Sequence, residues 1–415
     1  MAAEVPRIAD LASVLEPHLN GGKLVSYTSR YLTKPGDNYG SVMLALTANI
    51  EKPSGETEDI PLIAKLPPIT NDLFWQMFQP ERTCLTENAV YKYLSSALRD
   101  IQLEAGIPET EIFDGFPKYY GSRISLNPDA EKVDRDALLL QENLQTSGFK
   151  AGNRQVFFNL EQTKFILLEL AKFHALPIAL RLKKPEFFDK YIRPYFHRFN
   201  MNNMPQEMKE TMDSDLYKEI AIATDNNENY INRFKELMKE YDEFLSQPDA
   251  KDDLYTTISH CDLWINNLML KYDENGVATK VKFVDFQIAQ YESVAHDIIF
   301  LLFSSVEVPV LEEHMDEFLI LYYNAFIDCL KSVNVPTEQY SLLGFMKEIH
   351  RSAPVEICHA TFMTKILLAD NSTMPDDYKD MDMNVMSKNV GGKKIKEKII
   401  EIIRLAEKFK LLYKD

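Results

Sequence analysis

Two polar clusters in the second half of the chain have the residue types and the spacing that phosphoryl transfer requires. The first, His260–Asn267, reads HCDLWINN, so that an amide follows a carboxylate after five residues. The second, Asp285–Gln287, reads DFQ and adds a carboxylate eighteen residues after Asn267. In this reaction a base faces the acceptor hydroxyl, while an amide and a carboxylate hold the Mg²⁺ that bridges the nucleotide phosphates. The pattern therefore predicts ATP and Mg²⁺ as cofactors.

Each polar residue of the two clusters has a predicted role. Asp262 is the expected catalytic base, because it is the aspartate of the H-x-D-x4-N pattern. That spacing selects Asn267 over its neighbour Asn266 as a metal ligand, and Asp285, at the end of an apolar strand, is the second ligand. His260 is expected to brace the loop by hydrogen bonding. Taken one by one, these residues could equally be surface or capping residues, and only their spacing favours the chemical roles.

A lysine in the first third of the chain could bind nucleotide phosphates. Lys65 lies in an apolar strand, where an ammonium group is costly to bury without a partner. The α- and β-phosphates of ATP and the carboxylate of Glu87, on the following helix, are the predicted partners. The alternative is a lysine on an edge strand that points into water.

Two further segments could contact the nucleotide. The glycines of the turn Gly36 to Ser41, with Gly40 and Ser41 at its end, would let backbone N–H groups approach the phosphates. The turn lacks G-x-G-x-x-G, so it could also be a simple hairpin loop. Glu142 and Leu144, after the fifth strand, would present backbone groups to the adenine edge, or form an ordinary linker between lobes.

The predicted elements give an α+β, bilobal, protein-kinase-like fold. Residues 1–144 form a small nucleotide-binding lobe, with a five-stranded antiparallel sheet and one helix after the third strand. Residues 145–415 form a large, mostly helical lobe with the catalytic loop and the acceptor pocket. Alternating apolar residues and turn signals place the strands at 24–32, 41–50, 60–66, 116–124 and 137–144, and the helix at 83–98.

Three details of the large lobe are also predicted. A helix over 160–176 is ended or bent by Pro177, and its His174 is a satisfied core histidine. Asp297 caps the start of a short apolar helix. The amphipathic segment 393–410 is expected to pack on the large lobe, with a membrane surface as the alternative.

Composition restricts the partners and the location. The 415 residues carry a net charge of −17, which argues against a nucleic-acid partner. The four cysteines are scattered, as is typical of a reducing cytosol. No apolar run reaches the length of a membrane span, and the N-terminus does not read as a signal peptide. We expect a cytoplasmic protein without a membrane span, of unknown oligomeric state.

The motifs resemble those of the insect ecdysteroid kinase-like family, which belongs with the choline kinase and aminoglycoside phosphotransferase group. The resemblance rests on HCDLWINN, on DFQ and on Ser293–Leu301, which reads SVAHDIIFL, and it extends from about residue 36 to about residue 340. Further matches are Lys65, Glu87 with Tyr91, Leu139–Leu144 and Phe173-His174-Ala175.

The resemblance implies an active enzyme, because Lys65, Asp262, Asn267 and Asp285 are all present. The family pattern has glycine where this chain has Cys261. Cysteine is small, so we expect it to be tolerated there.

The acceptor is predicted to be a small molecule with a hydroxyl group. Eleven residues separate Asp285 from Asp297, fewer than a peptide-binding activation segment needs. The helical stretch 145–255 can enclose a small acceptor instead. The resemblance implies an ecdysteroid or a related steroid or xenobiotic alcohol, whereas the acidic balance would also suit choline or an aminoglycoside. A kinase-fold protein that only binds nucleotide or hormone is the non-enzymatic alternative.

Overall fold

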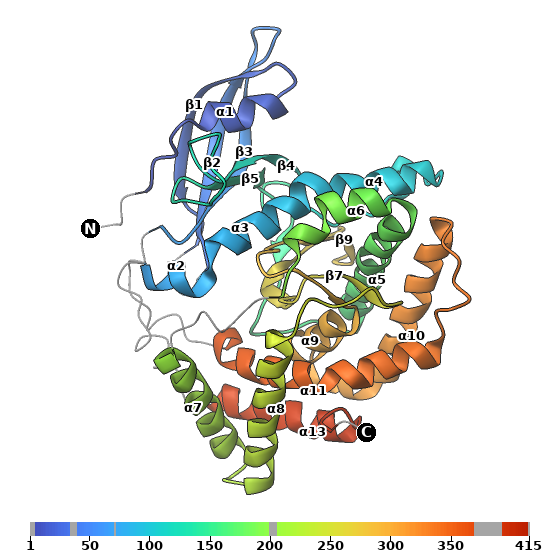
Figure 1. Ribbon diagram of the computed structural model, residues 1–415. Coiled ribbons are helices and arrows are strands. Elements are labelled where there is room, and N and C mark those ends of the chain that lie inside the picture. Colours follow the sequence, from blue (N-terminus) through green and yellow to red (C-terminus); the bar gives the residue numbers. More distant parts are fainter. Residues whose placement is uncertain (1–4, 34–39, 70–71, 199–205, 369–391, 414–415) are drawn as a thin grey trace. The chain divides into compact units, whose positions relative to one another are not determined.

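The computed structural model describes residues 5–33, 40–69, 72–198, 206–368 and 392–413. The chain divides into two compact units (Figure 1). Unit 1 contains the described residues of Met1–Lys92 and Phe116–Lys150. Unit 2 contains those of Tyr93–Gly115, Ala151–Ala369 and Asn389–Asp415.

Unit 1 is built on a five-stranded antiparallel sheet with the strand order β1-β2-β3-β5-β4. Its strands are β1 (Lys23–Tyr31), β2 (Val42–Glu51), β3 (Thr57–Leu66), β4 (Tyr119–Arg123) and β5 (Leu138–Glu142). The five predicted strands are therefore confirmed, although their ends differ by a few residues.

The two faces of this sheet have different surroundings. Leu62, Ala64 and Leu140 belong to one face, whose apolar core also includes Leu11 and Leu15 of helix α1 (Leu11–Leu15). Because side chains alternate along a strand, the residues between them point to the opposite face.

The register of β3 and β5 fixes which residues meet on that opposite face. Lys65 pairs with Leu139, and Ile63 pairs with Gln141. All four side chains are buried.

The helix after the third strand is longer than predicted. After α2 (Asp72–Phe78), the chain runs through α3 (Pro80–Ala89), a π-helical turn (Val90–Leu94) and α4 (Ser95–Glu104) without a break. The division between the two units falls inside the π-helical turn.

Unit 2 is mostly helical and contains two small sheets. The first is the pair β10-β7, and the second has three strands in the order β6-β8-β9. Its strands are β6 (Lys150–Ala151, at the unit boundary), β7 (Thr256–Ser259), β8 (Leu268–Tyr272), β9 (Ala278–Phe283) and β10 (Gln290–Ser293). Its main helices, besides α4, are α5 (Leu160–Lys183), α6 (Pro185–Tyr191), α7 (Gln206–Ala223), α8 (Glu228–Ser246), α9 (Ala295–Ser305), α10 (Val308–Ser332), α11 (Leu342–Leu367) and α13 (Lys393–Lys408). The predicted α+β class, with a mostly helical second part, is confirmed.

Helix α5 does not end at Pro177 as one reading of the sequence suggested. It continues to Lys183, and Pro177 lies in its interior. The residues after the proline, Ile178, Ala179 and Leu180, are fully buried. Their packing offsets the backbone hydrogen bond that proline removes. His174, on the same helix, is confirmed as a core histidine, since both ring nitrogens have partners.

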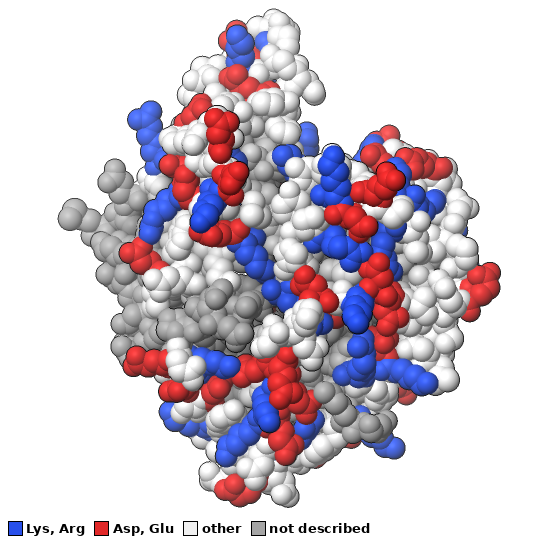
Figure 2. Space-filling view, in the orientation of Figure 1, with Lys and Arg blue, Asp and Glu red and all other residues white. Residues whose placement is uncertain are grey.

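Helix α13 packs inside unit 2, as predicted for the amphipathic segment. Its isoleucines Ile395, Ile399 and Ile402 are buried, and the helix contacts α7 and α11. Among the described residues, no helix is long and apolar enough to cross a membrane. On the face shown in Figure 2, lysine and arginine are interspersed with aspartate and glutamate.

Candidate functional site

The loop between β7 and β8 folds Asn267 back onto Asp262. The Asn267 Nδ2 donates to the main-chain oxygen of Asp262 at 2.8 Å and to the Asp262 Oδ2 at 3.1 Å. The 3₁₀ turn Ile265–Asn267 makes this return possible, and the Asn267 amide donates to the Trp264 carbonyl at 2.9 Å. The structure therefore brings together the carboxylate and the amide that the five-residue spacing singled out.

Asp285 is tied to the same loop through the residue before it. The Val284 N–H donates to the Asn267 carbonyl at 3.0 Å, and the Val284 carbonyl accepts from the His260 Nε2 at 2.9 Å. His260 thus braces the loop, as predicted. Asp285 itself has a left-handed backbone with φ of 66°. Asp262, Asn267 and Asp285 therefore belong to one hydrogen-bonded assembly in unit 2.

Asp262 is held in an environment that disfavours its charge. Burial raises the pKa of Asp262 well above its usual value, and the charge of Asp285 raises it further, while hydrogen bonds from Asn267 and Trp264 act in the opposite direction. The Trp264 indole is only 9% exposed, and its Nε1 makes no hydrogen bond of regular geometry.

These groups fit a divalent cation. Asp262 and Asp285 repel each other, and a cation relieves such repulsion. The Asn267 Nδ2 is taken up by Asp262, whereas the Oδ1 accepts no hydrogen bond in the described part of the chain. A side-chain carbonyl and a carboxylate are ligands that Mg²⁺ prefers. No group of three His, Cys, Asp or Glu side chains in the described ranges could hold a metal, so phosphate and water oxygens would have to complete the coordination.

The prediction that Asp297 caps the start of its helix is wrong, because α9 has no side-chain cap and Asp297 instead binds the backbone of a loop outside the helix. Helix α9 begins at Ala295, and the Asp297 carboxylate accepts from the amides of His260 at 2.6 Å and Cys261 at 2.7 Å. His174 Nε2 is its third partner, at 3.0 Å. Burial alone would raise the pKa of Asp297, but the hydrogen bond and the charge of His174 lower it. The sequence did carry a signal for this role, because an acidic residue inside a mostly apolar helix needs polar partners from other elements.

Cys261 has a left-handed backbone with φ of 62°. For a residue with a Cβ atom this conformation costs roughly 1–2 kcal/mol, and glycine adopts it freely. The backbone at this position thus favours glycine, the residue that the resemblance implies there. The two hydrogen bonds from His260 and Cys261 to Asp297 hold the loop in this conformation.

In unit 1, Lys65 and Glu87 form a buried ion pair. The Lys65 Nζ lies 2.7 Å from the Glu87 Oε2, and the side chains are 6% and 4% exposed. The pairing predicted from the apolar strand and the following helix is therefore confirmed. Removing two charges from water costs several kcal/mol per ion, so a buried pair is weak evidence of stability.

The structure describes only some of the other residues of unit 1 that were predicted to contact the nucleotide. Gly36 lies outside the described residues, whereas Gly40 and Ser41 are buried at the start of β2. The Glu142 amide donates to the Lys118 carbonyl at 2.9 Å, so it is already used within unit 1. The Leu144 amide donates to no acceptor in the described part of the chain.

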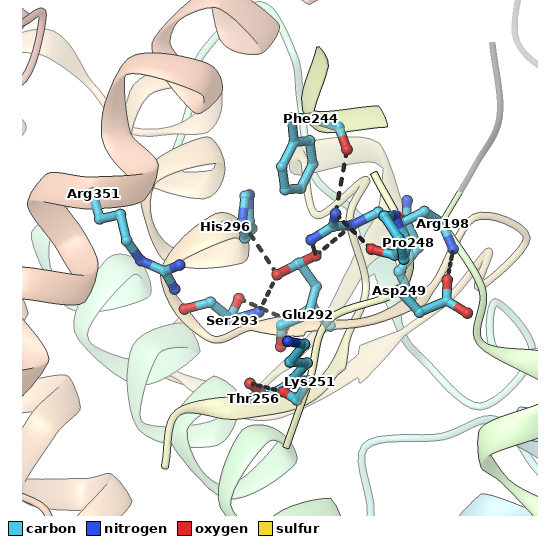
Figure 3. Close-up of polar contacts among 12 residues, drawn as sticks. Arg198, Phe244, Pro248, Asp249, Lys251, Thr256, Glu292, Ser293, His296 and Arg351 are labelled. Atoms are coloured by element: carbon cyan, nitrogen blue, oxygen red, sulfur yellow. Dashed lines mark hydrogen bonds and ion pairs between the residues drawn. The ribbon is translucent and has the colours of Figure 1, made fainter. Parts of the chain in front are cut away.

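A second polar network in unit 2 surrounds Glu292 (Figure 3). Arg198 contacts Glu292 through its guanidinium and also donates to the carbonyls of Phe244 and Pro248. The Arg198 amide donates to Asp249 at 2.8 Å. This arginine therefore joins the end of α8 to β10.

Next to this network, Glu356 is held between two histidines. Glu356 lies 2.6 Å from the His296 Nδ1 and 3.1 Å from the His359 Nδ1. Burial alone would raise the pKa of Glu356, but His296 and His359 lower it to about 2. Tyr241 stacks on His359, with ring centroids 5.9 Å apart, and Phe300 also stacks on His359, at 4.1 Å.

Tyr241, in this network, also responds to the charges of the acid loop, as we call His260–Asn267 together with Asp285. Its pKa is raised well above its usual value by burial first, then by Glu356, and also by Cys261 and Asp262. We call Tyr241, Phe244, His296, Phe300, Glu356 and His359 the aromatic cluster of unit 2. Sequence patterns did not single out these residues, since they come from three helices that pack together only in the folded chain.

Several solved structures are similar to the chain at low identity. Plasmodium vivax ethanolamine kinase has 11% identity and a TM-score of 0.40, with 92% of this chain and 84% of that chain covered. The GDP and kanamycin complex of APH(2")-IIia has 13% identity and a TM-score of 0.39, with 96% and 97% covered. A glucosamine kinase in complex with glucosamine, ADP and inorganic phosphate has 9% identity and a TM-score of 0.36, with 87% and 95% covered. TM-scores this low carry no argument about function.

No match is found among curated proteins. The model of the ecdysteroid kinase-like family, in contrast, matches residues 35–335, which is most of the chain and includes both polar clusters. The chain belongs to the ecdysteroid kinase-like family.

Proposed function

We propose that the protein is an ATP-dependent phosphotransferase that transfers the γ-phosphoryl group to a hydroxyl of a small molecule. The observation that carries this proposal is the assembly of Asp262, Asn267 and Asp285 in one hydrogen-bonded loop system. Family membership supports it. The protein needs few catalytic groups, because phosphoryl transfer depends mainly on positioning and on charge stabilisation.

In unit 2, Asp262 acts as the base. A carboxylate with a raised pKa can accept the proton of an acceptor hydroxyl that comes within hydrogen-bonding distance. Asn267 keeps the Asp262 carboxylate oriented through its Nδ2. Asp297 and His260 hold the backbone of the loop and touch no reacting atom, so they are positioning residues.

Asn267 and Asp285 would hold Mg²⁺. The metal would neutralise charge on the nucleotide phosphates and align them for transfer. Asn267 can serve both purposes, since the Nδ2 orients Asp262 and leaves the Oδ1 for the metal.

Unit 1 would hold the nucleotide. Lys65 would bind the α- and β-phosphates, with Glu87 keeping its ammonium group in place. Gly36, Gly40 and Ser41 would cover the phosphates, and Glu142 and Leu144 would meet the adenine edge, with the Leu144 amide as the available donor. We propose 1–144 as the nucleotide-binding lobe and 145–415 as the lobe with the base and the acceptor. A cytoplasmic location fits the four free cysteines.

The acceptor is proposed to be a neutral alcohol, such as an ecdysteroid or a related steroid or xenobiotic. The aromatic cluster would offer rings to such an acceptor, and its buried carboxylate, Glu356, is already paired with His296 and His359. The neighbouring Glu292 is paired with Arg198. A cationic acceptor such as choline or an aminoglycoside would need unpaired carboxylates, so it is the second candidate.

The test is turnover by the purified protein with ATP and Mg²⁺. A panel of polyhydroxylated steroids, choline and an aminoglycoside is compared by transfer of the labelled γ-phosphoryl group. We expect transfer to a steroid alcohol, and a loss of about 10²–10⁴-fold in Asp262→Asn. Asp273→Asn, in the exposed turn between β8 and β9, is the matched control. Acceptor binding without transfer at any Mg²⁺ concentration would instead favour a binding protein.

A further inference from the structure

Gln141 carries a buried amide group that the fold does not use. The side chain is 7% exposed, and its Nε2 has no hydrogen-bond partner in the described part of the chain. Leaving a buried donor unpaired is unfavourable. Such a group is therefore expected either to be replaced by an apolar one or to have a partner that arrives from outside.

In the described part of the chain, the Gln141 Nε2 is the one buried side-chain amide nitrogen without a partner. Gln102 donates to the Leu98 carbonyl and accepts from the Phe113 amide, at 2.9 and 2.8 Å. Asn143, two residues after Gln141, accepts from the Gln145 amide at 3.2 Å. Gln290 also has a buried amide atom without a partner in the described part of the chain, but that atom is its Oε1, and its Nε2 donates to the Ile288 carbonyl at 3.3 Å. The unpaired donor of Gln141 therefore points to an external partner.

The position of Gln141 indicates what that partner is. Gln141 lies opposite Ile63, and Lys65 is its diagonal neighbour on the same face of the sheet, at about 7–8 Å for such pairs. Ile63 also pairs with Ala45, and Leu139 completes the patch. Ala45, Ile63 and Leu139 are all buried and apolar. The face therefore carries an ammonium group, then an apolar patch, and then an unused amide.

This order of groups matches a purine nucleotide, with its phosphates, its flat base and the polar edge of that base. We propose that the Gln141 carboxamide hydrogen-bonds the exocyclic group at position 6 of a purine and so helps to determine nucleotide specificity. The inference rests on the proposed function, in which Lys65 binds the phosphates. A carboxamide has both donors and an acceptor, so it can face the amino group of adenine or the carbonyl of guanine. We therefore expect both ATP and GTP to bind.

The experiment compares dissociation constants for ATP and for purine riboside triphosphate, which lacks the exocyclic group, each with Mg²⁺. The wild-type protein should bind ATP more tightly by about 3–10-fold, the range of one hydrogen bond. In Gln141→Met, which keeps the size and removes the polar atoms, the two nucleotides should bind equally. The melting temperature of the free variant should rise, because an unpaired buried donor is gone. A purely structural glutamine would show the opposite change in melting temperature.

Asn49→Leu is the matched control, since it removes a carboxamide from the same face of the sheet at the far end of β2, where Asn49 bonds Asp59. Its ATP preference should equal that of the wild type. An unchanged preference in Gln141→Met would overturn the inference and leave the proposed function intact. A wild-type protein that binds neither nucleotide would overturn both.

Discussion

The ion pair of unit 1 and the acid loop of unit 2 hold their charged groups by different means. Lys65 and Glu87 sit on a regular strand and a regular helix, and one 2.7 Å contact joins them. The acid loop is irregular, with left-handed backbones at Cys261 and Asp285. Side chains that bond to its backbone maintain it. The first arrangement therefore depends on charge balance, and the second depends on backbone support.

The largest effect is expected from breaking the pair in unit 1. Lys65→Met leaves the Glu87 carboxylate buried without the lysine, which should reduce the free energy of unfolding by about 3–5 kcal/mol and abolish ATP binding. Urea unfolding and nucleotide titration measure the two effects. The double variant Lys65→Met with Glu87→Leu should regain most of the stability and still bind no ATP. Normal ATP binding by either variant would show that Lys65 is not the phosphate ligand.

The backbone support in unit 2 can be broken at Asp297. Asp297→Asn places an amide donor where the loop amides need acceptors, and this should reduce the free energy of unfolding by about 3 kcal/mol. Activity should fall with it, although Asp262, Asn267 and Asp285 are untouched. Asp316→Asn, on the exposed side of α10, should change stability by less than about 0.5 kcal/mol. Wild-type stability and activity in Asp297→Asn would contradict the positioning role.

The pair of His296 and Glu356 should make stability depend on pH. Burial alone would lower the pKa of His296, but Glu356 raises it above 6.5, so its contribution is complete below pH 6.5 and is lost as pH rises through the raised pKa. Glu356, lowered from 4.5 to about 2, contributes above pH 4.5 and loses its contribution as pH falls towards 2. The pair therefore stabilises most between pH 4.5 and 6.5.

His296→Gln tests this window. It should reduce the free energy of unfolding by about 2 kcal/mol at pH 5.5 and by clearly less at pH 9. Urea unfolding at both values measures the difference, and His350→Gln serves as the control. Equal destabilisation at the two pH values would mean that the pair is not charged.

The smallest expected effect concerns the backbone of the acid loop. Cys261→Gly should raise the free energy of unfolding by about 1 kcal/mol, because glycine adopts the left-handed conformation without strain. Cys261→Ala keeps the Cβ atom and should leave stability nearly unchanged. A destabilised glycine variant would show that the cysteine side chain matters more than the backbone.

The same contrast explains what could be predicted from the sequence. Lys65 and Glu87 were predicted as a pair because alternation and helical periodicity locate regular elements. Asp262, Asn267 and Asp285 were found by spacing. The role of Asp297 was not predicted, since it depends on contacts across 36 and 37 positions with irregular backbone. The continuation of α5 past Pro177 was missed for a similar reason, because buried packing overrode a local signal.

The dependence of the acid loop on Asp297 also sets an order of events during synthesis. The ribosome releases Asp262, Asn267 and Asp285 before α9 exists. A nascent chain that stops at residue 290 carries every side chain assigned to the metal and the base, yet only water can satisfy the amides of His260 and Cys261 that Asp297 later binds. The residues of the motif are therefore all synthesised before the loop can adopt its folded geometry. A truncated product that retains the motif should have no activity.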